Sequence, residues 1–325
     1  MKSSYFLAAV LPLMLACCTT RKSQVDQQPS AVSIEFNADS AYAFCAAQCD
    51  FGPRTMNSEA HEQCSRWIQQ KFAQYGCQVE LQQADLRGYD GTILKSTNII
   101  ARHPSTDSSL PTILICAHWD SRPWADNDPD EANWHKPVLA ANDGASGVAV
   151  MLELARVLQQ NDSACVAVDF VCFDAEDWGV PQWSSQVDAD SWALGAQHWA
   201  SQHQTPHYQY GILLDMVGGQ GAKFYKEGYS RQYARTIVDR VWQAAAAAGY
   251  GSFFPMKDSG HITDDHVPVN EKAHIPCIDI INHYPDCEQS SFGPTWHTVS
   301  DDMQHIDANT LKAVGQTLVQ LIYDK

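Results

Sequence analysis

Polar clusters whose side chains could bind a metal ion follow several apolar runs of this sequence. They are His118-Trp119-Asp120, Asp143, Glu176-Asp177, Asp215 and His297. Taken singly, an Asp after a strand is usually a turn or helix-cap residue. Carboxylates that recur at strand ends, however, repel one another unless a cation neutralises them. Because mixed carboxylate and imidazole donors suit zinc, the pattern predicts a zinc site.

The pair Glu176-Asp177 is the most informative cluster. Adjacent side chains diverge, so one can bind a metal ion while the other remains free as an acid/base group beside it. Two solvated loop acids would be the alternative, but the preceding run, residues 166–173, is almost continuously apolar. The motifs of other chemistries, GxxxxGK[ST], GxSxG, HExxH and GxGxxG, are missing from the sequence.

The elements that must position these clusters can be read from the spacing of apolar residues. Strands are predicted at 98–101, 112–117, 166–173, 210–217 and 275–281, and helices at 58–75, 145–159, 231–248 and 311–322. Strands that alternate with helices predict an α/β fold with a mixed, mostly parallel central sheet flanked by helices, an α/β/α sandwich. Ligands of such sheets bind at the carboxyl ends of the strands, where the polar clusters fall.

Composition narrows the possible functions. The 325 residues include 21 Lys and Arg against 38 Asp and Glu, a formal net charge of −17, which argues against nucleic-acid binding. Hydrophobic residues make up 45% of the chain, as in ordinary globular proteins. Because no Gly/Ser/Pro-rich stretch divides the middle of the chain, we expect one catalytic domain over residues 31–325, favoured as a monomer.

The first residues have the pattern of an export signal. Lys2 precedes an apolar run that ends in a small residue and then Cys17-Cys18. This resembles the lipobox of bacterial lipoproteins, which implies a signal peptide at 1–17, a lipid on Cys17 or Cys18, and a flexible tether at 18–30. We therefore expect a location in the cell envelope of a bacterium, periplasmic or surface-facing, with membrane contact only through the lipid. Simple secretion remains the alternative.

The clusters, taken in order, resemble a known family of zinc enzymes. The motifs are His118-Trp119-Asp120-Ser121, Asn142-Asp143-Gly144-Ala145-Ser146-Gly147, Phe173-Asp174-Ala175-Glu176-Asp177, Leu214-Asp215-Met216-Val217-Gly218 and Trp296-His297-Thr298. Together they are similar to the M28 zinc aminopeptidases, and they span most of the chain. Two activities compete within that family: aminopeptidases with two metal ions, and glutaminyl cyclases of the animal and bacterial kind.

Three features resemble the cyclase branch. One is an overall likeness to bacterial lipoprotein-type cyclases, which includes Leu213-Leu214-Asp215-Met216-Val217-Gly218 and Trp192-Ala193-Leu194-Gly195. The segment Thr263-Asp264-Asp265-His266-Val267-Pro268 is similar to the Asp-Asp-His-Ile-Pro loop of the cyclases, and Phe292 and Trp296 are similar to the aromatic residues that wall their pocket. The resemblance implies cyclisation of N-terminal Gln in peptides and proteins to pyroglutamate, with release of ammonia. Trp183 is a further candidate for the pocket wall, whereas ordinary packing is expected for Trp192.

The resemblance also implies a role for each site residue. Asp143, Asp177 and His297 would bind one zinc ion, Glu176 would transfer protons, Asp215 and Asp264 would support it, and His118 and Asp120 would surround the metal site. Asp177 stands where many relatives have Glu. In the aminopeptidase alternative, His118 and Asp215 would bind a second zinc bridged by Asp143. A binding module without catalysis is the third alternative.

Overall fold

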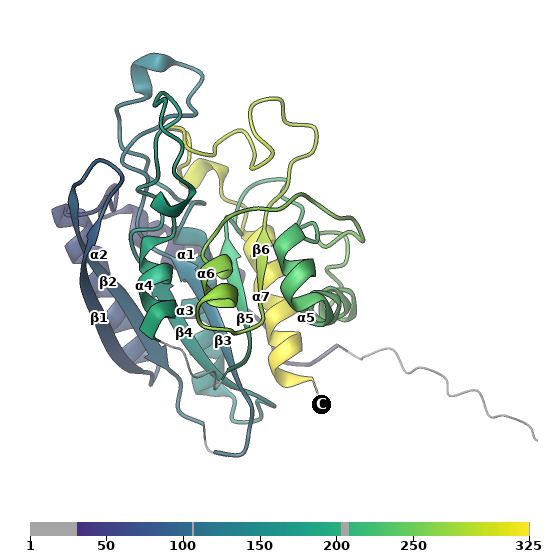
Figure 1. Ribbon diagram of the computed structural model, residues 1–325. Coiled ribbons are helices and arrows are strands. Elements are labelled where there is room, and N and C mark those ends of the chain that lie inside the picture. Colours follow the sequence, from purple (N-terminus) through teal and green to yellow (C-terminus); the bar gives the residue numbers. More distant parts are fainter. Residues whose placement is uncertain (1–30, 106, 203–207, 325) are drawn as a thin grey trace, which may run out of the picture.

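The computed structural model describes residues 31–105, 107–202 and 208–324, so the predicted signal peptide and tether lie outside the described residues. A six-stranded sheet forms the centre of the chain (Figure 1), in the order β1-β2-β4-β3-β5-β6. The strands are β1 Gln78–Arg87, β2 Ile93–Arg102, β3 Thr112–His118, β4 Ala167–Phe173, β5 Tyr208–Asp215 and β6 Cys277–Ile281.

The strands run in mixed directions. β3 is parallel to β4 and β5, and β5 is parallel to β6, whereas β2 is antiparallel to both β4 and β1. The predicted mixed, mostly parallel sheet is therefore confirmed. β1 was not predicted, because this edge strand has only exposed and half-buried residues and lacks an apolar run.

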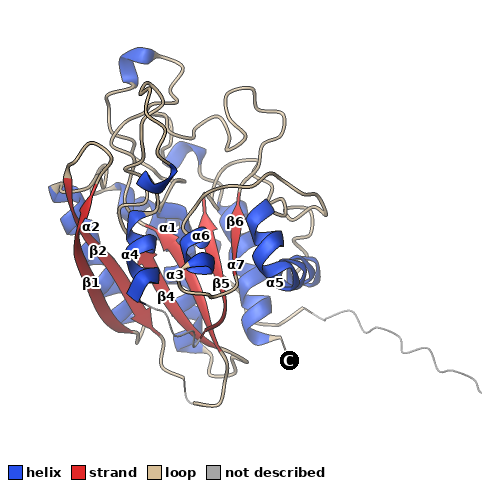
Figure 2. Cartoon of the chain, in the orientation of Figure 1, coloured by secondary structure: helices blue, strands red, loops and turns tan. Residues whose placement is uncertain are grey.

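Helices cover both faces of the sheet (Figure 2). One layer comprises α1 Ala38–Cys49, α2 Glu59–Gln74, α3 Ala145–Gln160, α5 Gly228–Ala247 and α7 Ala308–Tyr323, whose apolar side chains share one core. The other layer comprises α4 Leu194–Gln202 and α6 His266–Glu271, which share a second core. Among the described residues, none of the helices has the length and hydropathy needed to cross a bilayer.

Helix α3 begins in close contact with the end of β5. A Cβ atom on Gly147 would lie 2.3 Å from the backbone oxygen of Leu214, so only glycine permits this approach. The contact brings Asp143, just before α3, towards Asp215 at the end of β5. The long loops that follow the parallel strands gather at this same edge of the sheet (Figure 2).

Candidate functional site

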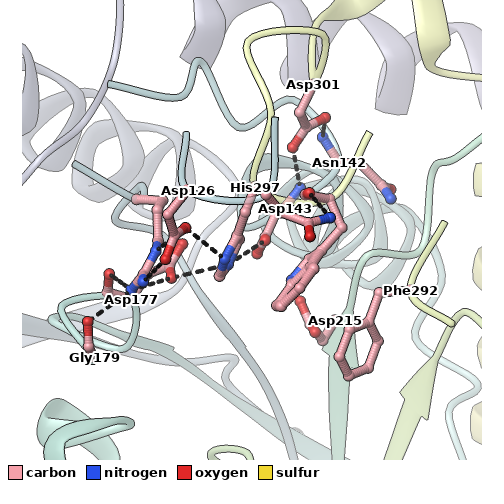
Figure 3. Close-up of polar contacts among 12 residues, drawn as sticks. Asp126, Asn142, Asp143, Asp177, Gly179, Asp215, Phe292, His297 and Asp301 are labelled. Carbon is pink, nitrogen blue, oxygen red and sulfur yellow. Dashed lines mark hydrogen bonds and ion pairs between the residues drawn. The ribbon is translucent and has the colours of Figure 1, made fainter. Parts of the chain in front are cut away.

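The predicted polar clusters converge at the carboxyl edge of the parallel strands. His118 is the last residue of β3, Asp215 is the last residue of β5, and Asp177 follows β4. Asp143 precedes α3, and His297 comes from the loop before α7 (Figure 3). All five side chains are buried. They form two overlapping groups that share Asp143, each with donor atoms within 4.8 Å of one another.

The first group, here called the His297 triad, comprises Asp143, Asp177 and His297. Nε2 of His297 lies 3.2 Å from Oδ1 of Asp177 and 3.5 Å from Oδ2 of Asp143. Both carboxylate oxygens of Asp177 are buried without a hydrogen-bond donor. Such orphaned oxygens are rare in native structures and fit a carboxylate that coordinates a cation. The donor set of two carboxylates and one imidazole suits zinc.

A carboxylate absent from the sequence prediction stands behind His297. Oδ1 of Asp126 lies 3.3 Å from Nδ1 of His297, the ring nitrogen on the side away from the triad. Such a partner fixes the orientation and tautomer of a metal-binding imidazole. Asp126 belongs to a loop of residues 122–136 with many acids, and no spacing in the sequence distinguishes it from its neighbours.

The second group, the His118 triad, comprises His118, Asp143 and Asp215. Nε2 of His118 lies 3.0 Å from Oδ1 of Asp143 and 3.4 Å from Oδ1 of Asp215. On its other side, Nδ1 of His118 lies 3.5 Å from Oδ1 of Asp120. Nε2 of His118 forms a hydrogen bond with Asp143, whereas Nδ1 of His118 and Oδ1 of Asp215 are buried without a hydrogen-bond partner. This triad is therefore satisfied in part by its own members.

Two buried carboxylates hold the backbone of the site. The backbone N–H groups of Glu176 and Asp177 donate to the carboxylate of Asp120, each at 3.1 Å. Those of Asn142 and Asp143 donate to Asp301 at 2.8 and 3.0 Å (Figure 3). Burial raises the pKa of Asp301 to about 7, and the charge of Asp143 acts in the same direction. Asp301 was not predicted.

Backbone strain is concentrated beside these side chains. Ala175, Met216 and His297 have left-handed φ values of 54°, 48° and 53°. Ala175 directly precedes Glu176, and Met216 directly follows Asp215. Residues other than glycine rarely adopt this conformation, and it persists where the surrounding structure enforces it, often at functional sites.

The pKa values of several other acidic residues are raised. Burial raises the pKa of Asp215 to about 8, opposed by His118 and reinforced by Asp264. Burial, and then the charge of Asp177, raise the pKa of Glu176 well above its usual value. The pKa values of Asp265 and Asp279 are also raised by burial and by Asp264. Neither Asp265 nor Asp279 was predicted as a member of the site.

A cavity of about 300 Å³ opens beside the His297 triad. Its lining comprises Asp143, Glu176, Ala189, Trp192, Asp215, Met216, Ile262, Thr263, Asp264, Ile281, Phe292, Trp296 and His297. The lining therefore combines acidic groups with large apolar side chains. Trp296 stacks on the imidazole of His297 with ring centroids 3.9 Å apart, and Phe292 packs on Trp296 at 4.9 Å.

The tryptophans differ from the sequence prediction in two places. Trp183, predicted to wall the slot, is absent from the cavity lining; it is 39% exposed and stacks on Trp134 of the neighbouring loop. Trp192, for which ordinary packing was expected, lines the cavity and lies parallel to His297 at 6.0 Å. The paths of these loops, which have no regular periodicity, determine which tryptophan reaches the site.

Carboxylate and imidazole donors at the carboxyl edge of a mixed sheet define a metal-dependent α/β enzyme. The profile of peptidase family M28 matches residues 98–322, and the chain belongs to this family. The resemblance inferred from the motifs is thereby confirmed.

Curated relatives fall into both branches of the family. Aminopeptidase YwaD of Bacillus subtilis is 28% identical over 241 residues, which cover 70% of this chain and 44% of that protein. The glutaminyl-peptide cyclotransferase of Gloydius blomhoffii is 26% identical over 236 residues, which cover 63% of this chain and 60% of that protein. The chain thus spans about half the length of these relatives.

Solved structures of similar proteins align with this chain over almost their whole length. The glutaminyl cyclase of Bacteroides thetaiotaomicron, bound to N-acetylhistamine, is 47% identical with a TM-score of 0.84, covering 90% of this chain and 99% of that chain. The glutaminyl cyclase of Tannerella forsythia is 46% identical, with a TM-score of 0.85 and the same coverage. A Zn-dependent exopeptidase from Parabacteroides distasonis is 45% identical, again with a TM-score of 0.85, 90% of this chain and 99% of that one.

Proposed function

We propose that this chain is a glutaminyl-peptide cyclotransferase that converts N-terminal Gln to pyroglutamate and releases ammonia. The observation that carries the proposal is the asymmetry of the two triads. Both carboxylate oxygens of Asp177 lack a hydrogen-bond partner, whereas in the His118 triad Nε2 of His118 forms a hydrogen bond with Asp143 and one oxygen of Asp215 lacks a partner. One metal site beside a cavity that is partly lined by large apolar side chains suits a small, neutral side chain. The similarity to two bacterial glutaminyl cyclases supports the same activity.

The reaction is an intramolecular acyl transfer. The α-amine nitrogen of the terminal Gln attacks the amide carbon of its own side chain, a five-membered ring closes, and the carbon–nitrogen bond to the amide NH₂ breaks. One proton leaves the α-amine and one is added to the departing nitrogen, so ammonia is the only other product. The enzyme must hold the bent substrate and move this proton.

The residues of the cavity divide these tasks. Phe292 and Trp296 form an apolar wall that holds the Gln side chain in its bent conformation and excludes water. Glu176 takes the proton from the amine and returns it to the leaving nitrogen. Its raised pKa favours a carboxyl group that can hold the proton between these two steps. A zinc ion held by Asp143, Asp177 and His297 would polarise the amide oxygen as a Lewis acid.

The buried acids Asp215 and Asp264 act through Glu176. Both line the cavity, and the charge of Asp264 is among the influences that raise the pKa of Glu176. Their role is to keep Glu176 able to hold a proton between the two halves of the reaction. His118 and Asp120 hold Asp143 and the Glu176–Asp177 backbone in place.

A dinuclear aminopeptidase is the second candidate, since the donors of His118, Asp143 and Asp215 also lie within 4.8 Å of one another. Such an enzyme would bind two zinc ions and hydrolyse the first peptide bond. Similarity to aminopeptidase YwaD and to a Zn-dependent exopeptidase supports this second candidate.

Mass spectrometry of a short peptide beginning with Gln distinguishes the two activities. After incubation with zinc-loaded protein, we expect a product lighter by one ammonia, with all peptide bonds intact, formed faster than in the uncatalysed control. Release of free Gln would instead establish an aminopeptidase. The zinc content of the same sample, one ion or two per chain, provides an independent readout.

The natural substrates would be peptides and proteins that meet the enzyme outside the cytoplasm. This part of the proposal rests on the predicted leader at residues 1–17 and the cysteines that follow it. Labelling with radioactive palmitate, followed by extraction of the membrane fraction, tests the lipid anchor directly.

A further inference from the structure

A fully buried cation lies beside the metal site. Arg122 follows the His118-Trp119-Asp120-Ser121 motif and is 1% exposed. Burial of a guanidinium is strongly unfavourable unless its charge and its N–H donors are satisfied. The groups that satisfy Arg122 therefore show which part of the site this side chain holds.

Each side-chain hydrogen bond of Arg122 reaches Asp126 or the backbone beside Asp177. Nε and Nη2 donate to the two carboxylate oxygens of Asp126, at 3.1 and 2.6 Å, in a bidentate pair. Nη1 donates to the backbone oxygens of Asp177 and Gly179, both at 3.0 Å. The same nitrogen lies 3.5 Å from Oδ1 of Asp177.

Asp126 extends this arrangement to the second ligand. Its Oδ1 lies 3.3 Å from Nδ1 of His297 (Figure 3). The same oxygen accepts a hydrogen bond from Nε of Arg122. Its Oδ2 also accepts the backbone N–H of Gln182 at 2.9 Å. Arg122 thus contacts Asp177 directly and reaches His297 through one intervening side chain.

The flat faces of the guanidinium contact tryptophans. The carbon at its centre lies 4.6 Å from the ring centroid of Trp192 and 5.2 Å from that of Trp124. Trp192 lines the cavity, so Arg122 also supports the cavity wall without entering the cavity itself.

We infer that Arg122 is a positioning residue that fixes two zinc ligands, Asp177 and His297, and the cavity wall at Trp192 in one geometry. Its effect on metal binding does not depend on which reaction the enzyme performs; only its effect on KM rests on the proposed function. Lysine cannot take this role, because a single ammonium lacks the planar fork that meets Asp126 and two backbone oxygens together.

Zinc affinity provides the decisive test. In the full chain, Arg122→Lys is expected to raise the zinc dissociation constant by about 10- to 100-fold, the loss typical when a supporting partner of a metal ligand is removed. Competition with a chromogenic chelator measures this constant without turnover. KM for a Gln peptide should also rise. Arg54→Lys is the matched control, because Arg54 is equally buried but donates to the backbone oxygens of Trp119, Leu139 and Ala140.

A second variant tests the path from Arg122 to His297. Asp126→Asn should also weaken zinc binding, and the double variant with Arg122→Lys should weaken it by less than the product of the two single effects. If Arg122→Lys fails to fold, Asp126→Asn alone still tests the assignment by the same titration.

Three outcomes would overturn the inference: an unchanged dissociation constant in Arg122→Lys or Asp126→Asn, an equal loss in Arg54→Lys, or fully multiplicative effects in the double variant. Failure of the proposed cyclisation is distinguishable, because the peptide would then lose no ammonia while Arg122→Lys still weakened zinc binding.

Discussion

The two triads of the site contain the same kinds of donor and share Asp143, yet their surroundings differ. In the His297 triad both carboxylate oxygens of Asp177 lack a hydrogen-bond partner, and a supporting pair, Asp126 and Arg122, lies behind it. In the His118 triad Nε2 of His118 forms a hydrogen bond with Asp143, and the triad lies towards the acids that raise the pKa of Asp215. Donor type and spacing alone therefore do not define a metal site; the partners of each donor decide whether it is free to bind.

The largest effect on turnover is expected at Glu176, which belongs to neither triad. Glu176→Gln should lower kcat by about 10² to 10⁴, the usual contribution of a general acid/base, since the amide cannot accept the proton. Zinc content should remain unchanged, because Glu176 is not a ligand in either triad. Steady-state kinetics and metal analysis of the same preparation check both points.

This variant separates proton transfer from metal binding. A loss of zinc in Glu176→Gln would place Glu176 among the ligands, and retention of substantial turnover would remove it from the mechanism. The melting temperature, compared with that of the unmodified protein, controls for misfolding.

Replacement of the two histidines tests the comparison between the triads most directly. His297→Ala should weaken zinc binding by about 100-fold or more, since it removes one of three protein ligands from a binding free energy of roughly 10–16 kcal/mol. His118→Ala should weaken it far less, because His118 acts only by holding Asp143. Chelator competition measures both constants. Equal losses in the two variants, or two zinc ions per unmodified chain, would show that both triads bind metal.

A smaller effect is expected in the cavity. Trp296→Ala should raise KM about tenfold, which corresponds to about 1.4 kcal/mol of lost apolar contact with the Gln side chain. Trp183→Ala is the matched control and should leave KM unchanged, because Trp183 is absent from the cavity lining. If Trp183→Ala raised KM as much as Trp296→Ala, the substrate would have to reach the outer loops.

The smallest effect is expected at the contact between α3 and β5, which brings Asp143 towards Asp215. Gly147→Ala would place a Cβ atom 2.3 Å from the Leu214 backbone oxygen. The helix must shift, at a cost of about 1–3 kcal/mol of stability, seen as a lower melting temperature. Gly260→Ala is the control, because its Cβ atom would have no neighbour within 4 Å. An equal melting temperature in both variants would show that α3 can move away from β5 without strain.

Sequence reasoning worked best where burial is continuous. The apolar runs at 112–117 and 166–173 correspond to β3 and β4, and the polar residues after such runs meet at one edge because the strands are parallel. Helix α1 was not predicted, because its apolar residues do not form a strong amphipathic pattern.

The supporting residues were beyond sequence reasoning for a different reason. Arg122 and Asp126 lie in an irregular loop, and Arg122 donates to backbone oxygens of Asp177 and Gly179, more than fifty residues away along the chain. Trp296 was predicted to line the slot, and it does. The choice between Trp183 and Trp192 depends on the path of the single connection between β4 and α4, to which both belong. Periodicity carries no information about such paths.

The left-handed backbone at Ala175, Met216 and His297 links metal supply to the lifetime of the fold. Each such residue costs about 1–3 kcal/mol of conformational free energy, so the folded, metal-free chain is destabilised where its catalytic groups lie. A cation that binds only the folded chain offsets this destabilisation. It raises the free energy of unfolding by about 2.7 kcal/mol when its free concentration is 100 times the dissociation constant. The resistance of the protein to unfolding would then follow the free zinc concentration around it, so that metal scarcity would limit how long the enzyme survives as well as how fast it works.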